Sequence, residues 1–226
     1  MKVAPCTARS AKYACERWHY SETAPASMLK LGVWDSENKF VGCMLYGYGS
    51  GKATRGDAYG LRKTHDIAEL QRVAMRANHG LIVSQVVAAG VRIVKKHCPN
   101  LRMLISFADE GWRGHVGTIY QASGWIYTGV VRGRAAYIVK GERIHPRSTH
   151  ARKWKNLLSW IRANVDPNAI VETSLKHRYL YPLDDEVKKR IIPMSKPYPK
   201  RAESADSGTS AIQAGRGGAS PTSALF

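Results

Sequence analysis

The stretch Ile105–Trp125, with the sequence ISFADEGWRGHVGTIYQASGW, changes from a buried strand to a polar loop and then to a short helix. Its apolar run ends at Asp109, a carboxylate at the C-terminal end of the strand, and a glycine-rich turn with His115 follows. The helix then ends in the pattern Tyr120-x-x-x-Gly124-Trp125. Strand ends and the loops after them are where α/β proteins hold reactive groups. The stretch therefore predicts either a functional site or a plain strand–turn–helix connection with solvated polar residues.

The composition is that of a globular protein, but its charge is unusual. Hydrophobic residues make up 44% and charged residues 23% of the 226 residues, which is ordinary for a globular domain. Lys and Arg number 35 against 17 Asp and Glu, so the formal net charge is +18. Such an excess predicts a polyanionic partner, with nucleic acid ahead of a membrane surface.

The cysteines and the start of the chain indicate a reduced, cytosolic setting. The 4 cysteines are scattered and form no Cys-x-x-Cys pair, which argues against a disulfide framework and a structural zinc site. The first residues, MKVAPCTARSAKYACERW, contain no signal-peptide core, and no apolar run reaches membrane-spanning length. We therefore expect a cytoplasmic protein without a membrane partner.

Periodicity before Ile105 predicts alternating strands and helices. A cap at Thr7 or Ser10 starts a helix that ends near Trp18, and a helix C-terminus favours the protonated form of the next residue, His19. A later helix start offers free backbone N–H groups, so residues 73–81 are a candidate phosphate-binding loop, although any strand–helix unit has such an end. The other predicted elements are strands over 2–6, 28–34, 40–47 and 68–75 and a helix over 81–97.

The elements after residue 100 complete the expected fold. They are a strand over 101–108, the short helix that ends at Tyr120, and two strands over 126–131 and 135–139. A basic turn at residues 132–134 is expected to join the last two strands as a terminal hairpin. The fold class is α/β of the α+β kind, with a mixed, mainly antiparallel sheet flanked by helices.

From residue 140 onward the sequence becomes strongly basic. Residues 140–201 hold 15 Lys and Arg against 6 Asp and Glu, a balance of +9, with aromatic residues interleaved. This pattern predicts contact with a phosphate backbone, and the alternative is a merely solvated charged face. A helix is expected over 148–164. We predict a catalytic domain over 1–140, a basic extension over 141–201 that packs on it and contacts DNA, and a disordered tail over 202–226.

Several motifs carry a resemblance to known families. The pattern Tyr120-x-x-x-Gly124-Trp125, after a strand ending in Asp109, resembles the end of a GNAT acyltransferase domain. More specifically, the chain resembles the bacteriophage Mom family of DNA-modification proteins over residues 2–201. The motifs that carry this resemblance are Trp18-His19-Tyr20, Glu69-Leu70-x-Arg72, Ser106-x-Ala108-Asp109, Gly114-His115-x-Gly117-Thr118-x-Tyr120, His145-Pro146-Arg147 and the basic ending Lys176–Leu183.

The resemblance implies a GNAT-like fold and the conversion of adenine in DNA to carbamoylmethyl-adenine. This modification shields phage DNA from host restriction, so the implied setting is the cytoplasm of a bacterial host, with a phage or prophage gene. The implied partner is double-stranded DNA and the implied cofactor is acetyl-CoA or a related acyl-CoA. In the GNAT pattern Tyr120 protonates the departing coenzyme A thiolate. One departure is that residues 72–80 contain only Gly80, where the usual pyrophosphate loop has paired glycines.

The implied reaction makes demands that specific residues can meet. A paired adenine must be flipped out of the duplex, and Tyr20 and Trp112 are candidates to stack on it. Asp109 is a candidate acceptor for the amino proton, and His19 is a second acid or base. The product needs a nitrogen-to-methylene bond and a source of amide nitrogen, which thioester chemistry alone does not supply. An activating iron on His19, Tyr20 and Asp109 is one interpretation, and an acid–base network is the other.

The predicted site residues form three sets. The catalytic residues are His19, Tyr20, Asp109 and Tyr120. The cofactor-binding residues are Arg72, Val73, Ala74, Asn78, Gly80 and Thr118. The DNA-binding residues are Arg147, Lys153, Lys176, His177, Arg178 and Lys188.

Two other functions fit the same features. An ordinary GNAT acetyltransferase would acetylate a protein or a small amine without DNA, but it gives no reason for the charge of residues 140–201. A non-catalytic DNA-binding protein on an inactive scaffold would bind DNA with a steep salt dependence that survives Asp109→Ala. Fold alone does not separate these functions.

Overall fold

A computed structural model describes five ranges of the chain, and they divide into two compact units. The first unit consists of Met1–Val131 and Lys176–Pro199, and the described part of the second is 132–144, 157–175 and 200. The predicted domain over 1–140 and extension over 141–201 stay predictions, because compactness assigns no role to either unit. The tail over 202–226 lies outside the described residues. The described ranges are 1–49, 56–61, 64–110, 115–144 and 157–200.

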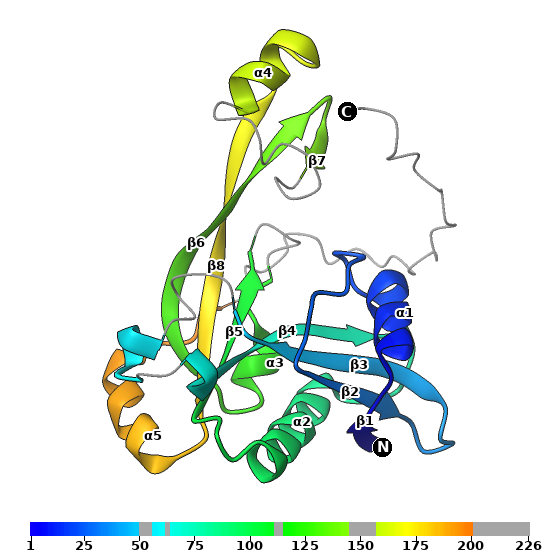
Figure 1. Ribbon diagram of the computed structural model, residues 1–226, viewed down its shortest axis with the longest axis vertical. Helices are drawn as coiled ribbons and strands as arrows, with labels where there is room; N and C mark the ends of the chain where they lie inside the picture. Colours follow the sequence, from blue (N-terminus) through cyan, green and yellow to red (C-terminus); the bar gives the residue numbers. More distant parts are fainter. Residues whose placement is uncertain (50–55, 62–63, 111–114, 145–156, 201–226) are drawn as a thin grey trace. The chain divides into compact units, whose positions relative to one another are not determined.

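A mainly antiparallel sheet forms the centre of the first unit (Figure 1). β1 to β4 pair antiparallel in sequence order, β4 and β5 pair parallel, and β5 pairs antiparallel with β8. The strand order β1-β2-β3-β4-β5-β8-β6-β7 confirms the predicted fold class. The strands are β1 (Lys2–Pro5), β2 (Leu29–Trp34), β3 (Phe40–Gly47), β4 (Ile67–Met75), β5 (Met103–Asp109), β6 (Ile126–Val139), β7 (Glu142–Ile144) and β8 (Ile170–Pro182).

Helices cover both faces of this sheet. Successive side chains of a strand point to opposite faces, and on β3 Cys43 packs with α1 while Met44 belongs to the cluster beneath α2. Thr7 caps α1, as predicted, by accepting a hydrogen bond from the Ser10 N–H at 3.1 Å. None of the described helices is long and apolar enough to cross a membrane. The helices are α1 (Ala8–Trp18), α2 (Val83–His97), α3 (Thr118–Gln121), α4 (Leu157–Asn164) and α5 (Asp185–Ile191), with 3-10 turns η2 (Gly56–Tyr59), η3 (Thr64–Asp66) and η5 (Ile192–Met194).

One predicted feature of the second half is corrected. β6 is one strand from Ile126 to Val139, so the prediction of a turn at residues 132–134 was wrong. The backbone irregularity instead lies at Gly129, whose φ is +98°, and the long strand β8 beside β6 supplies hydrogen-bond partners along it. Lys176–Pro182 is the last part of β8 and pairs with β5 inside the sheet.

The second unit has a small core of its own. This core is a cluster of the buried residues Val139, Leu157, Ile161 and Ala169. β6 and β7 form a hairpin in which Tyr137 pairs with Ile144. α4 ends at Asn164, as predicted, whereas residues 148–156 of the expected helix lie outside the described residues.

Candidate functional site

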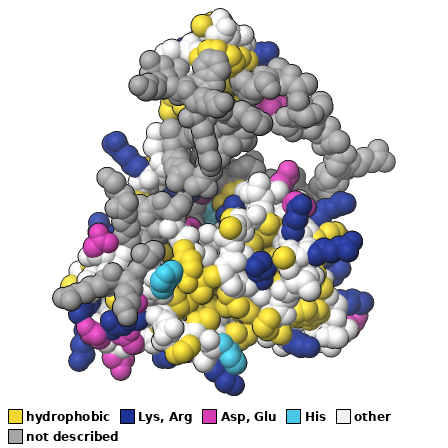
Figure 2. Space-filling model, viewed as in Figure 1, with side chains coloured by type: hydrophobic (Ala, Val, Ile, Leu, Met, Phe, Trp, Pro, Cys, Tyr) yellow, Lys and Arg dark blue, Asp and Glu magenta, His cyan; other side chains and the backbone are white. Residues whose placement is uncertain are grey.

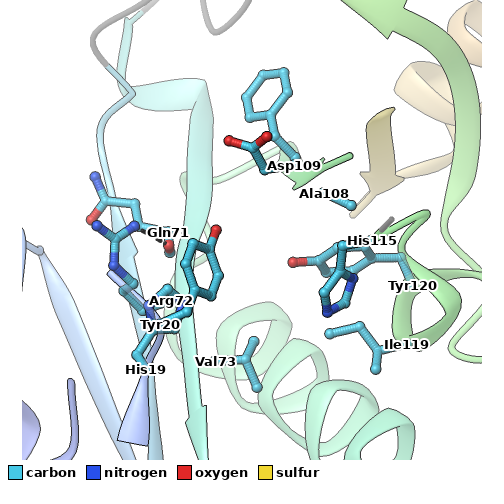
Figure 3. A pocket seen from close by; sticks show the side chains of 11 residues that line it. His19, Tyr20, Gln71, Arg72, Val73, Ala108, Asp109, His115, Ile119 and Tyr120 are labelled. Carbon is cyan, nitrogen blue, oxygen red and sulfur yellow. Dashed lines mark hydrogen bonds between the residues drawn. The ribbon is translucent and has the colours of Figure 1, made fainter. Parts of the chain in front are cut away.

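The candidate site lies where two neighbouring strands diverge. The pairing of β4 with β5 ends at Glu69 and Ile105, although β4 continues to Met75 and β5 continues to Asp109. A cavity of about 120 Å³ lies between the separated ends, and we call it the β4–β5 cavity (Figure 3). Its lining residues are His19, Tyr20, Gln71, Arg72, Val73, Phe107, Ala108, Asp109, His115, Ile119 and Tyr120. All four predicted catalytic residues are thus at one cavity.

Tyr120 enters the cavity from α3 and is held by a short hydrogen-bond chain. Its hydroxyl is 2.8 Å from the Ser106 Oγ, which is 2.8 Å from the Leu70 carbonyl oxygen. Ser106 has one hydroxyl hydrogen, and the Leu70 carbonyl only accepts. When Ser106 donates to Leu70, the Tyr120 hydroxyl therefore donates to Ser106. Burial raises the pKa of Tyr120 to about 12, so its hydroxyl is protonated at neutral pH and acts as a donor.

His19 is a neutral side chain at the edge of the cavity. Burial, together with the charges of Arg72 and His115, lowers the pKa of His19 to about 4. The expectation that the end of α1 keeps His19 protonated was therefore wrong, because burial outweighs the helix dipole. The Ser21 backbone N–H lies 3.1 Å from the His19 Nδ1 and can only donate, so Nδ1 accepts. Neutral His19 consequently carries its proton on Nε2.

Tyr20 and Arg72 border the same side of the cavity. The Tyr20 ring lies 4.3 Å from the His19 ring, centroid to centroid, and Tyr20 is 47% exposed. Figure 3 shows the Tyr120 hydroxyl pointing into the cavity, toward the side on which Tyr20 lies. The Arg72 guanidinium donates to the Thr23 carbonyl at 3.2 Å and to the Gln71 carbonyl at 2.7 Å. Arg72, predicted to bind a cofactor, thus also ties the segment after α1 to β4.

Asp109 lies on the β5 side of the cavity, separated from His19 in Figure 3. Its carboxylate is 3.5 Å from the Lys176 Nζ, and these two residues are partners in the β5–β8 register. Among the described residues no group of three or more His, Cys, Asp or Glu is arranged to hold a metal ion. The described residues thus give no support to the iron site considered for His19, Tyr20 and Asp109.

The predicted cofactor residues divide between the cavity and the turn into α2. Val73 lines the cavity, whereas Ala74 is fully buried in the cluster beneath α1 and its side chain does not reach it. Asn78 and Gly80 have positive φ angles of 55° and 69°, and a Cβ built on Gly80 would meet nothing within 4 Å. α2 begins with no side-chain cap, so the open turn and the uncapped N–H groups fit a phosphate-bearing cofactor. Thr118 is the first residue of α3.

Of the four predicted DNA-binding residues that the structure describes, three are engaged with other side chains or buried. His177 is 5% exposed and its Nδ1 lies 3.0 Å from the Tyr127 hydroxyl, so its prediction as a DNA contact is corrected: the sheet buries it. Arg178 donates to the Thr128 Oγ1 at 2.8 Å and lies 5.8 Å from the Tyr59 ring centroid. Lys188 is exposed on α5. Arg147, Lys153 and the stacking candidate Trp112 lie outside the described residues.

Sequence reasoning missed two residues of the site. Gln71 lines the cavity, and Ser106 supports it through its hydrogen bonds. For Ser106 a signal was present, because it opens the motif Ser106-x-Ala108-Asp109. A strand position alone does not reveal which side chain a serine will touch across the sheet. The hydrogen bond to Tyr120 could only be found in the folded structure.

Comparisons with known proteins give one family match and a set of similar solved structures. A family model described as the Mom protein family matches residues 1–200. No curated protein matches. Similar solved structures include the aminoglycoside 6'-N-acetyltransferase from Enterococcus faecium, with 9% identity, a TM-score of 0.45 and coverage of 82% of this chain and 98% of that chain. Another is spermidine N-acetyltransferase from Vibrio cholerae in complex with CoA and spermine, with 9% identity, a TM-score of 0.45 and coverage of 80% and 95%.

Proposed function

The chain belongs to the Mom protein family, and on that premise we propose that it converts adenine in double-stranded DNA to carbamoylmethyl-adenine. The observation that carries the proposal is the β4–β5 cavity, which His19, Tyr20, Asp109 and Tyr120 all line. In a bacterial host the modified base would protect phage DNA from restriction. The net charge of +18 is consistent with a DNA substrate.

The residues of the cavity have distinct tasks in this proposal. A flipped adenine enters the cavity, and Tyr20, half-exposed beside His19, offers a ring for stacking. Asp109 accepts the proton that the amino group loses as its nitrogen forms the new bond. The Lys176 ammonium, 3.5 Å away, keeps a compensating charge beside that carboxylate. Neutral His19 donates a hydrogen bond through Nε2 and does not serve as the base.

The donor is proposed to be an acyl-CoA, held at the cavity and at the turn from β4 into α2. When bound, it would supply an activated acetyl group and a thiolate leaving group. Tyr120, with its pKa raised to about 12, is a protonated hydroxyl able to give its proton to that leaving group. The Ser106 hydroxyl then donates to the resulting phenolate oxygen instead of to Leu70.

The proposed reaction balances only if two co-reactants take part besides the DNA and the acyl-CoA. Joining the adenine nitrogen to the methyl carbon of an acetyl group removes two hydrogens, hence two electrons, so a two-electron oxidant is required. Converting the acyl carbon to an amide consumes ammonia or an amide nitrogen donor. The chain's own part is to bind the base, exclude water and move the two protons at Asp109 and Tyr120.

The test is mass spectrometry of nucleosides from plasmid DNA of bacteria that express the protein. Wild type is expected to yield carbamoylmethyl-adenine, and Asp109→Asn and Tyr120→Phe are expected to yield little or none. Asp185→Asn, which changes an exposed carboxylate on α5, is the matched control and should behave as wild type. Unmodified DNA from wild type and all variants would contradict the proposal. Acetylation of an amine without DNA would instead indicate an ordinary acetyltransferase, and DNA binding with no altered base an inactive scaffold.

A further inference from the structure

The solvent-facing side of α1 carries a line of basic and aromatic residues. α1 buries Ala11, Ala14 and Cys15 against the sheet. Arg9, Tyr13 and Arg17 follow one another at intervals of four residues, so they lie along one face of the helix, and all three are exposed. We call these three residues the Arg9–Arg17 line. The chain then reaches Tyr20, at the β4–β5 cavity.

The two guanidinium groups of this line stand apart from the other charged groups of the described part of the chain. Among the residues that the structure describes, no hydrogen bond or ion pair to Arg9 or Arg17 is found. The adjoining Lys12 differs, because it lies 3.7 Å from the Glu16 carboxylate. Tyr13 is 51% exposed. Figure 2 shows Lys and Arg side chains gathered over the part of the surface where α1 lies.

Unpaired arginines gain most from an anionic partner, since no existing ion pair has to be broken. The predicted DNA contacts Lys176 and Arg178 are by contrast already engaged, with Asp109 and with Thr128. Arg9 and Arg17 are eight positions apart, and a rise of 1.5 Å per residue separates their Cα atoms by about 12 Å. At roughly 3.4 Å of helix axis per nucleotide, that length matches three to four nucleotides of one strand.

We propose that the Arg9–Arg17 line is a docking surface for the sugar–phosphate backbone of the DNA strand beside the target base. The proposal rests on the proposed function, because it takes DNA as the substrate of the β4–β5 cavity. In this arrangement each arginine neutralises one phosphate, and Tyr13 lies between them. The strand so held leads along α1 to Tyr20, where the flipped base enters.

The experiment measures DNA affinity as a function of salt for the full-length protein. Fluorescence anisotropy with a labelled 24-base-pair duplex, in KCl from about 50 to 300 mM, gives the slope of log K against log [KCl] for each variant. Each phosphate contact contributes about 0.9 to the magnitude of that slope, so Arg9→Ala/Arg17→Ala should reduce it by about 2. Arg9→Lys/Arg17→Lys should keep the wild-type slope, because the charges remain.

The matched control is Arg92→Ala/Lys96→Ala, which removes two exposed basic residues from α2. It should leave the slope unchanged, and thermal melting should show that both double variants are folded. An unchanged slope in Arg9→Ala/Arg17→Ala, or an equal loss in both alanine pairs, would overturn the docking surface. If only the proposed function fails, the result is different. DNA from bacteria that express the wild-type protein then carries no altered base, but the two alanine pairs still differ in slope. A wild type without any DNA binding would overturn both.

Discussion

Gly117 gives the sharpest test of how the site is packed. It precedes α3 with φ of +80°, and a Cβ added there would lie 2.5 Å from the Tyr179 Cε2 and 3.0 Å from the Tyr120 Cδ2. Both rings are buried, and the Tyr179 hydroxyl is fixed by hydrogen bonds with the Val116 carbonyl and the Gln121 amide. The Tyr120 ring lines the β4–β5 cavity, and the Tyr179 ring packs against it with a centroid distance of 5.2 Å.

The expected cost of Gly117→Ala has two parts. A left-handed conformation costs an alanine about 1–2 kcal/mol, and overpacking a buried site adds about 1–3 kcal/mol. The free energy of unfolding should therefore fall by about 2–5 kcal/mol. Gly124→Ala is the control, because φ there is +77° but nothing lies within 4 Å of the added Cβ. It should lose only the conformational part, about 1–2 kcal/mol.

Equilibrium urea unfolding measures both variants, with equal m values required before the midpoints are compared. The difference between the two substitutions, about 1–3 kcal/mol, isolates the clash with the two tyrosines. A Gly117→Ala protein as stable as Gly124→Ala would refute the packing described around Tyr179 and Tyr120. Base modification should follow the same order, with Gly117→Ala the more impaired.

Three further predictions concern a titration, a hydroxyl and an ion-pair network. The pKa of His19 is about 4 in the folded protein against 6.5 for an ordinary histidine, so between these pH values the unfolded chain binds more protons and stability is lost as the pH falls. The loss should reach at most about 3 kcal/mol, and urea unfolding at several pH values should show a flatter profile for His19→Gln. Ser106→Ala removes the hydroxyl that contacts Tyr120 and should lower the modification rate about tenfold, while Ser106→Thr should restore it. An unchanged rate in Ser106→Ala would contradict the hydrogen-bond chain. Arg102→Met removes contacts of 2.7 Å to Asp184 and 2.6 Å to Glu186. It should lower the free energy of unfolding by about 1 kcal/mol, and this loss should disappear in 1 M salt. Lys39→Met, the control at an exposed pair with Glu37, should cause no measurable loss.

Much of the first unit could be predicted from local pattern. The strands β1 to β5 and the helices α1 and α2 begin and end within about two residues of their predicted limits. These elements are specified by information within one segment: the spacing of apolar residues, a Thr7 cap and glycines at turns. The motifs around Asp109 and Tyr120 likewise predicted these two residues as part of a site, and both line one cavity.

Contacts between distant segments were beyond the reach of local pattern. Asp109 pairs with Lys176, 67 positions later, and nothing near either residue specifies that partner. The continuous strand β6 was mistaken for two because a glycine between arginines has turn composition, while its partner β8 lies far along the chain. A strand's register depends on which neighbour it buries, which is a property of the whole sheet.

The sequence by itself determined the elements, the excess of positive charge and the residues able to do chemistry. Only the tertiary structure decided the protonation, contacts and burial of these residues. In the fold β4 and β5 separate, and burial keeps His19 neutral. The Tyr120 hydroxyl contacts Ser106, and His177 is buried. The physical reason is that protonation and hydrogen bonding depend on burial and on the nearest charges, and both come from segments that folding alone brings together.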